Sequence, residues 1–185
     1  MCSKSSDGSV LSYRSSDGYR YSAIGIQSSQ EFSIKREQDG FYLETKPEWV
    51  SKSKFVTILE TTSRMIFLLS ESDQPTESNS RRKMIQPESF AASICKDDQG
   101  DSQKNFQSFA KAPFMCDFGD FSFPVLNDAV TAGNEIFAVF STKRETFRKS
   151  ALCFYSVEDV EKNITDSGKG IITINIERCS IQNIS

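Results

Sequence analysis

The 185-residue sequence contains no histidine. Histidine is the usual side chain for acid–base catalysis near neutral pH, for nucleophile activation and for imidazole metal sites. No Cys-x-x-Cys spacing occurs either, so the ligand pattern of a tight zinc site and that of a thioredoxin-type redox centre are both missing. The sequence therefore predicts a protein that is not an enzyme and that binds no cofactor or metal.

Long apolar runs and an excess of basic charge are also missing. No apolar run approaches the roughly 20 residues that a membrane-spanning helix needs, and no charged-then-apolar leader follows Met1. The 22 Lys and Arg residues are outnumbered by 25 Asp and Glu residues, for a formal charge of −3. We therefore expect no nucleic-acid partner, and membrane association only through regions outside this sequence.

Short β-type segments recur along the chain. Hydrophobic residues make up 37% of it and include fifteen Phe, which is enough for a packed core. The continuously apolar segment 65–69 is typical of a strand buried on both faces. Many short strands predict an all-β architecture, either a sandwich or a propeller. We expect strands at 19–26, 41–45, 54–59, 64–70, 90–95, 106–112, 135–141, 151–157 and 170–176.

The remaining segments predict turns, one helix and a long loop. Asp17-Gly18 between two apolar stretches indicates a hairpin turn. Residues 156–164 have apolar positions at helical spacing and acidic residues near the start, as in a short surface helix. Residues 70–89 are polar and contain two Pro, which predicts a flexible loop. Its basic run 81–83 either docks an acidic partner or is simply solvated.

The five cysteines leave two interpretations open. They are Cys2, Cys95, Cys116, Cys153 and Cys179. Three of them end candidate strands, which is consistent with bridges between neighbouring strands in an oxidising compartment. The alternative is an intracellular protein with five buried thiols.

Two other sets of residues are candidate sites. Sequons at Asn163 and Asn183 would accept N-linked glycans in a secreted protein. Asp117 and Asp120 lie close enough in sequence for a two-carboxylate enzyme site. Their surroundings are rich in Phe and Gly, however, and favour a turn over a catalytic pair.

Two segments of residues 95–116 carry a more specific pattern. Residues 95–100 read CKDDQG and residues 106–116 read FQSFAKAPFMC. Together they resemble the semaphorin domain, in which a Cys-Lys-x-Asp-x-Gly turn leads into an aromatic-x-Ser/Thr-Phe-x-Lys-Ala strand that ends in Cys. Residues 135–141 (EIFAVFS) and 150–160 (SALCFYSVEDV) resemble the next two strands and the short acidic helix of that family.

Weaker matches extend upstream, so the ordered resemblance runs from about residue 19 to residue 160. Residues 41–56 resemble the family's Trp-Leu-x-x-Pro-x-Phe-Val region, although no Pro lies between Trp49 and Phe55. Residues 65–71 resemble its apolar strand that ends in Arg-Glu, with Ser70 in the position usually held by Arg.

The resemblance implies part of a seven-bladed β-propeller. On this basis residues 1–185 form an incomplete sema domain of about two to three blades, and residues 95–160 are the best-matched block. The family pattern pairs Cys116 with Cys153 and, on weaker grounds, Cys95 with Cys179. The partner of Cys2 is expected upstream of the sequence.

The same resemblance implies an extracellular, non-catalytic signalling ligand that binds plexin-type receptors in axon or cell guidance. Full-length semaphorins act as dimers, so a homodimer of the parent protein is expected. Plexins share the propeller, and residues 137–141 and 150–153 also resemble a plexin. The turn 95–100 and the strand 109–112 favour the semaphorin interpretation.

No motif identifies a residue that contacts a partner. Lys96, Asp97, Asp98 and Lys111 are polar enough for surface contacts, although Lys111 would serve equally to pair with a carboxylate and the two Asp to form a turn. The remaining alternative is an intracellular all-β interaction module with reduced cysteines.

Overall fold

The chain folds into three four-stranded antiparallel sheets. The computed structural model describes residues 8–50, 52–71, 89–118, 121–142 and 149–166, together with the backbone of residues 178–183. In each sheet the strands follow one another in sequence order. Sheet 1 contains β1 (Gly8–Arg14), β2 (Arg20–Ile26), β3 (Glu31–Gln38) and β4 (Phe41–Glu44).

Sheets 2 and 3 repeat this four-stranded plan. Sheet 2 contains β5 (Ser53–Glu60), β6 (Arg64–Glu71), β7 (Ser89–Cys95) and β8 (Ala110–Pro113). Sheet 3 contains β11 (Val125–Ala132), β12 (Glu135–Ser141), β13 (Lys149–Ser156) and β14 (Arg178–Asn183). A two-stranded hairpin of β9 (Cys116–Phe118) and β10 (Phe121–Phe123) lies between them in sequence, and a 3₁₀ turn (Pro47–Trp49) joins sheets 1 and 2.

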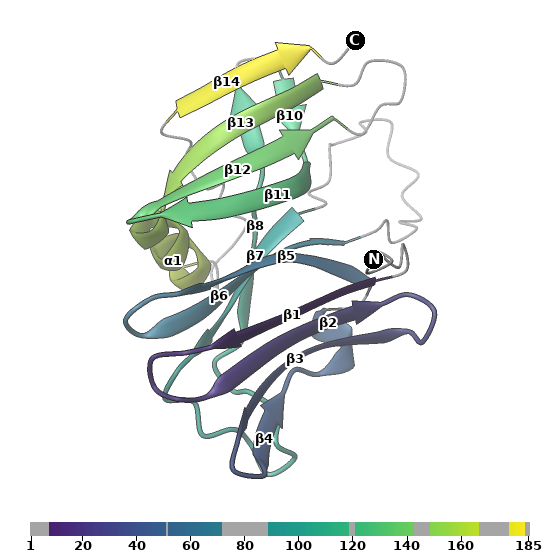
Figure 1. Cartoon of the computed structure of the whole chain (residues 1–185), viewed down its shortest axis with the longest axis vertical. Helices are drawn as coiled ribbons and strands as arrows, with labels where there is room; N and C mark the ends of the chain where they lie inside the picture. The colour runs from purple at the N-terminus through teal and green to yellow at the C-terminus, as the bar shows by residue number, and fades with distance from the viewer. Residues whose placement is uncertain are drawn as a thin grey trace, which may run out of the picture.

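The three sheets are stacked, with sheet 2 between sheets 1 and 3 (Figure 1). The first strands of the sheets are neighbours, because β1 contacts β5 and β5 contacts β11. Successive four-stranded meanders with their first strands side by side are the arrangement of β-propeller blades. The predicted all-β fold, a partial propeller of two to three blades, is confirmed with three blades.

Two hydrophobic cores hold the stack together, one on each face of sheet 2. Tyr21, Ile34 and Leu43 of sheet 1 pack in one core with alternate residues of β6. The other residues of β6 pack against sheet 3 in the second core. All five residues of segment 65–69 are fully buried, which confirms the prediction of a strand covered on both faces.

Most expected strands are confirmed, and one is shorter than predicted. Segment 106–112 contains the strand β8 only from Ala110 onward, because Phe106 lies in a loop and inserts its ring into the first core. The expected strand at 170–176 lies outside the described residues, as does basic run 81–83. Strands β1, β3, β9, β10, β11 and β14 were not predicted. β9 and β10 have only three residues each, and polar residues occupy many positions of β1, β3, β11 and β14.

Two Asp-Gly turns set the register of sheet 1. The predicted turn at Asp17-Gly18 joins β1 to β2, and Gly18 has a φ of +89°. Asp39 and Gly40, which join β3 to β4, both have positive φ, as a tight primed turn requires. At the junction with sheet 2, a Cβ added to Gly25 would lie 2.2 Å from the carbonyl oxygen of Ser53.

The predicted helix is confirmed and its place is now defined. α1 (Val157–Asp166) begins one residue later than expected and buries Val160 and Ile164. It packs against β7, β8 and β13, so it bridges sheets 2 and 3. Ser70, Glu71 and Ser89, expected in the loop 70–89, belong to strands β6 and β7. Within the described residues, no helix is long and apolar enough to cross a membrane.

Candidate functional site

The turn after β7 contains three of the polar residues that the sequence singled out. Asp98 is buried, and its carboxylate accepts hydrogen bonds from the backbone N–H groups of Gly100, Gln107 and Ser108 at 2.7–2.9 Å and from the Ser108 hydroxyl. Burial opposes ionisation, but these hydrogen bonds lower the pKa of Asp98 below its ordinary value. The carboxylate therefore holds the turn together, and the turn hypothesis for Asp98 is supported.

Arg36 of β3 fastens this turn to sheet 1. Its guanidinium is buried and donates a 2.7 Å hydrogen bond to the carbonyl oxygen of Lys96, and another to that of Asp98. The same group lies 4.7 Å from the ring centre of Tyr19. The Arg36 guanidinium is planar, buried and stacked on Tyr19, and it donates to two carbonyl oxygens. Arg36 therefore holds the turn after β7 against sheet 1.

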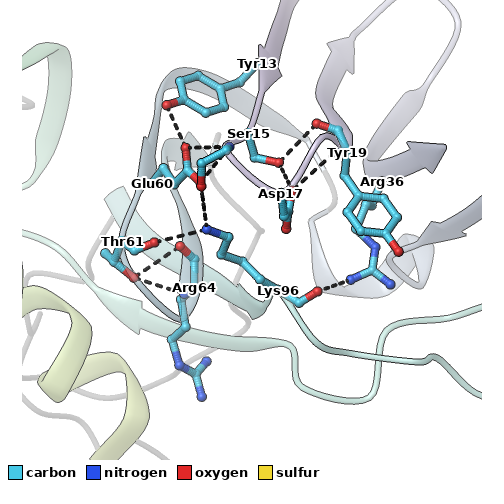
Figure 2. Close-up of polar contacts among 10 residues, drawn as sticks. Tyr13, Ser15, Asp17, Tyr19, Arg36, Glu60, Thr61, Arg64 and Lys96 are labelled. Atoms are coloured by element: carbon cyan, nitrogen blue, oxygen red, sulfur yellow. Dashed lines mark hydrogen bonds and ion pairs between the residues drawn. The ribbon is translucent and has the colours of Figure 1, made fainter.

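Glu60, at the end of β5, is the centre of a second polar contact between sheets 1 and 2 (Figure 2). Its carboxylate accepts hydrogen bonds from Lys96 Nζ at 2.7 Å, the Tyr13 hydroxyl at 3.0 Å and the Ser16 backbone N–H at 2.9 Å. We call Tyr13, Ser16, Glu60 and Lys96 the Glu60 cluster. Glu60 and Lys96 are each only 14% exposed, so this ion pair is mostly shielded from water.

Electrostatics keep Glu60 ionised. Burial alone would raise the pKa of its carboxyl, but the hydrogen bonds from Lys96, Ser16 and Tyr13 outweigh burial and lower the pKa to about 2. The Tyr13 hydroxyl donates a hydrogen bond to Glu60, and this hydrogen bond raises the pKa of Tyr13. A carboxylate with this pKa and these partners is unsuited to accept a proton in catalysis.

Lys111 has a structural role as well. Its ammonium group donates hydrogen bonds to the carbonyl oxygen of Trp49 and to the Glu71 carboxylate, both at 2.8 Å, and lies 4.8 Å from the ring centre of Phe90. Of the two roles considered for Lys111, the structure supports the stabilising partner of a carboxylate.

The candidate carboxylate pair of Asp117 and Asp120 lies partly outside the described residues. Asp117 is exposed on β9, opposite Ser122, and Asp120 lies outside the described residues. Asp97 is also exposed. Across the described ranges, no three His, Cys, Asp or Glu side chains are grouped so that they could hold a metal ion.

One predicted disulfide is present and the other is not. Cys116 of β9 is bonded to Cys153 of β13, with a Cα–Cα distance of 6.3 Å. Cys95, by contrast, is a free thiol, so the expected Cys95–Cys179 bridge is wrong for this structure. The reason is topological: Cys95 ends β7 in sheet 2, whereas Cys179 lies in β14 of sheet 3, opposite Cys153. Cys2 is outside the described residues.

The two sequons lie on different elements. Asn163 is in the last turns of α1, where its amide donates a 2.8 Å hydrogen bond to the carbonyl oxygen of Asp159. The middle residue of this sequon, Ile164, is fully buried. Asn183 is the last residue of β14, opposite Lys149 in register.

The β9–β10 hairpin exposes two aromatic residues that the sequence reading did not single out. Phe118 and Phe121 are opposite each other and are 50% and 46% exposed. Lys149 Nζ lies 3.9 Å from the ring centre of Phe121, and the disulfide of Cys116 anchors the hairpin to sheet 3. The available sequence signal for this surface was the pair of Phe residues on either side of Gly119-Asp120 in the sequence.

Comparisons with known proteins agree with this fold. The model of the Sema domain family matches residues 124–172, a range that includes β11, β12, β13 and α1. Semaphorin-6D of Homo sapiens is 30% identical over 163 residues, which are 79% of this chain and 15% of that protein. The solved structure of Drosophila Plexin A in complex with Semaphorin 1b matches with a TM-score of 0.64 and 27% identity. The chain contains part of a sema domain.

The sema-domain likeness covers most of this chain and a minor part of its relatives. Drosophila Semaphorin 2a matches with a TM-score of 0.66 at 18% identity, over 85% of this chain and 29% of that one. The Plexin A complex is matched over 83% of this chain and 31% of the other. The chain therefore spans under a third of these solved chains and about one-sixth of the Semaphorin-6D relatives. The relatives and solved structures that it matches are semaphorins and plexins.

Proposed function

We propose that this chain is part of a semaphorin-type extracellular ligand that binds a plexin-type receptor without catalysis. The observation that carries the proposal is the 30% identity to Semaphorin-6D over 163 residues. The described polar clusters support it, because Asp98, Glu60 and Lys111 are occupied by hydrogen bonds inside the protein. Recognition then depends on loops and exposed side chains, as is usual for β scaffolds.

The domain organisation belongs to the same proposal. Residues 1–185 would be an incomplete sema domain whose remaining blades lie elsewhere in a longer polypeptide, with homodimer formation a property of that longer protein. The disulfide between Cys116 and Cys153 is consistent with an oxidising, extracellular location.

Surface plasmon resonance would test the ligand proposal in two arms. The 185-residue chain is passed over the immobilised extracellular region of Plexin A, and separately over the immobilised extracellular region of Semaphorin 1b. Saturable binding to the plexin surface is expected. Binding to the semaphorin surface alone would favour the receptor interpretation, which the solved Plexin A complex makes the second candidate. Absence of binding to both surfaces would contradict both interpretations.

Matched variants would localise the contact. Phe118→Ser with Phe121→Ser removes the exposed aromatic pair of the β9–β10 hairpin, while Phe41→Ser with Tyr42→Ser removes an exposed pair on β4. Exposed aromatic residues are common energetic anchors of protein interfaces. Loss of plexin binding in the first variant, with binding retained in the second, would assign the contact to the hairpin.

Glycan attachment at Asn163 and Asn183 is part of the same extracellular proposal. Because Ile164 is buried and Asn163 is hydrogen-bonded within α1, modification of Asn163 would have to precede folding of the helix. Chain secreted from a eukaryotic host should lose mass on treatment with an N-glycosidase, and Asn163→Gln should remove one glycan. An unchanged mass would contradict this part of the proposal.

A further inference from the structure

Three of the chain's five cysteines meet at one point of sheet 3. Cys153 of β13 is bonded to Cys116 of the β9–β10 hairpin. On its other side lies β14, the strand that borders β13 in sheet 3 (Figure 1). The register of these two strands places Cys179 directly opposite Cys153. Cys153 therefore has one cysteine bonded to it and a second cysteine opposite it on the neighbouring strand.

The register of β13 and β14 meets the backbone requirement for a disulfide. Directly opposite residues of antiparallel strands have Cα atoms about 4.5–5.5 Å apart, and they share one face of the sheet. Disulfides form when the two Cα atoms are roughly 4.4–6.8 Å apart. The bond of Cys153 with Cys116 spans a Cα–Cα distance of 6.3 Å. The backbone position of Cys179 thus permits a bond to Cys153, as that of Cys116 does.

Cys95 is not a further candidate for this bond. It ends β7 in sheet 2, where it is opposite Arg64 and is a free thiol. β7 pairs with β6 and β8, whereas β13 pairs with β12 and β14. The two cysteines that compete for Cys153 are therefore Cys116 and Cys179.

The two bonds would connect different parts of the molecule. A bond from Cys153 to Cys179 joins neighbouring strands within sheet 3, whereas the bond to Cys116 ties the β9–β10 hairpin to that sheet. Among the described strands, β9 and β10 pair only with each other, so side-chain contacts must hold the hairpin. Besides the disulfide, these include a 3.0 Å hydrogen bond from the Tyr155 hydroxyl to the Met115 carbonyl oxygen and the contact of Lys149 with the Phe121 ring.

We propose that Cys153 changes disulfide partner between Cys116 and Cys179 by intramolecular thiol–disulfide exchange. The Cys179 thiolate attacks Cys153 Sγ, the bond between Cys153 and Cys116 breaks, and Cys116 leaves as a thiolate that takes up a proton. One disulfide and one thiol are present before and after the step, so no oxidant or reductant is consumed. The hairpin is covalently tethered to sheet 3 in the first state and released from that tether in the second.

The surroundings of the disulfide favour an internal attacker over a dissolved one. Cys116 and Cys153 are fully buried, so a thiol in solution has poor access to them, whereas Cys179 belongs to the adjacent strand. The three cysteines lie within sheet 3 and its hairpin, so the exchange takes place equally in a longer polypeptide with further blades. It goes beyond the proposed function and does not depend on receptor binding.

Disulfide mapping of two matched variants tests the alternative bond. Trypsin places the four cysteines concerned in separate peptides, 84–96, 112–143, 150–162 and 179–185. After free thiols are blocked with N-ethylmaleimide, mass spectrometry of Cys116→Ser should find peptide 150–162 bonded to peptide 179–185. Cys179→Ser should keep the bond between Cys116 and Cys153. A blocked Cys153 in Cys116→Ser, or its bond to Cys95, would overturn the proposal.

The wild-type chain gives a test that does not depend on the folding of a variant. After timed incubation at about pH 8.5, blocking should reveal the bond between Cys153 and Cys179 together with an equal amount of blocked Cys116. The exchange rate should fall roughly tenfold per pH unit below the pKa of the attacking thiol, because only the thiolate attacks, and it should not depend on protein concentration. Detection of the bond between Cys116 and Cys153 alone at all times, or a rate proportional to concentration, would refute the proposal.

Limited proteolysis measures the release of the hairpin. Chymotrypsin should cleave Cys116→Ser after Phe118 and Phe121 several-fold faster than it cleaves Cys179→Ser, in which the tether remains. Cleavage after the exposed Phe41 of β4 should be equal in the two variants, which separates local release from general unfolding. Equal cleavage of the hairpin in both variants would contradict the tethering role of the bond to Cys116.

Discussion

Glu60 offers the sharpest test of how sheets 1 and 2 are joined. In the folded chain its pKa is about 2, against an ordinary value of 4.5. At roughly 1.4 kcal/mol per pKa unit this shift corresponds to about 3 kcal/mol of preference for the ionised form. Water at the edge of the cluster screens part of the attraction. We therefore expect Glu60→Gln to reduce the free energy of unfolding by about 2 kcal/mol at pH 7.

The direction in which the stability contribution of Glu60 changes with pH follows from its two pKa values. Because the folded-state pKa is lower than the unfolded-state value, the contribution of Glu60 is fully present above about pH 4.5. It is lost as the pH falls toward about 2, where the folded form also takes up the proton. The difference in unfolding free energy between wild type and Glu60→Gln should accordingly shrink over this interval.

Urea unfolding between pH 2 and 7, followed by the fluorescence of the single Trp49, measures both effects. Glu31→Gln is the matched control, since Glu31 is exposed at the start of β3 and its replacement should change stability by less than about 0.5 kcal/mol. The reasoning is refuted if Glu60→Gln is as stable as the control at pH 7, or if its deficit persists unchanged at pH 2.

Three further predictions concern other parts of the structure. Replacing Cys116 and Cys153 by Ser should cost about 4 kcal/mol of unfolding free energy, from the 37-residue separation that the disulfide closes; denaturant unfolding with an unchanged midpoint would contradict this. Gly25→Ala should lower the melting temperature sharply, because its Cβ would meet the Ser53 carbonyl oxygen at 2.2 Å; a wild-type melt in calorimetry would oppose the close-contact argument. Alkylation without reduction, read by mass spectrometry, should label Cys95; an unreactive Cys95 would count against the free thiol.

Local pattern was sufficient to predict many of the strands. Alternation of apolar residues and Asp-Gly turns operate over a few residues, so β2, β5, β6, β7 and β12 could be located without knowledge of the partner strands. β1 and β3 were not predicted because the half of each strand that faces away from the core is mostly polar. Their assignment requires knowing which neighbour covers the other half.

The roles of the polar residues could not be predicted in the same way. Lys96 and Asp98 stood out as part of a family-like turn, but nothing in the sequence pairs Lys96 with Glu60, or Arg36 with the carbonyl groups of that turn. These partners are tens of residues apart. Whether a charged side chain is a surface contact or an internal fastening depends on which strands the fold brings together.

By itself the sequence determined the all-β character, the short helix and, through family likeness, the bond between Cys116 and Cys153. Each depends on residue type and short-range spacing, or on a pattern carried in the sequence. Only the tertiary structure decided that Cys95 remains a free thiol and that Val130 and Val139 of sheet 3 are exposed. Those outcomes depend on the stacking order of whole sheets, because a side chain is paired or exposed according to which distant segment lies against it.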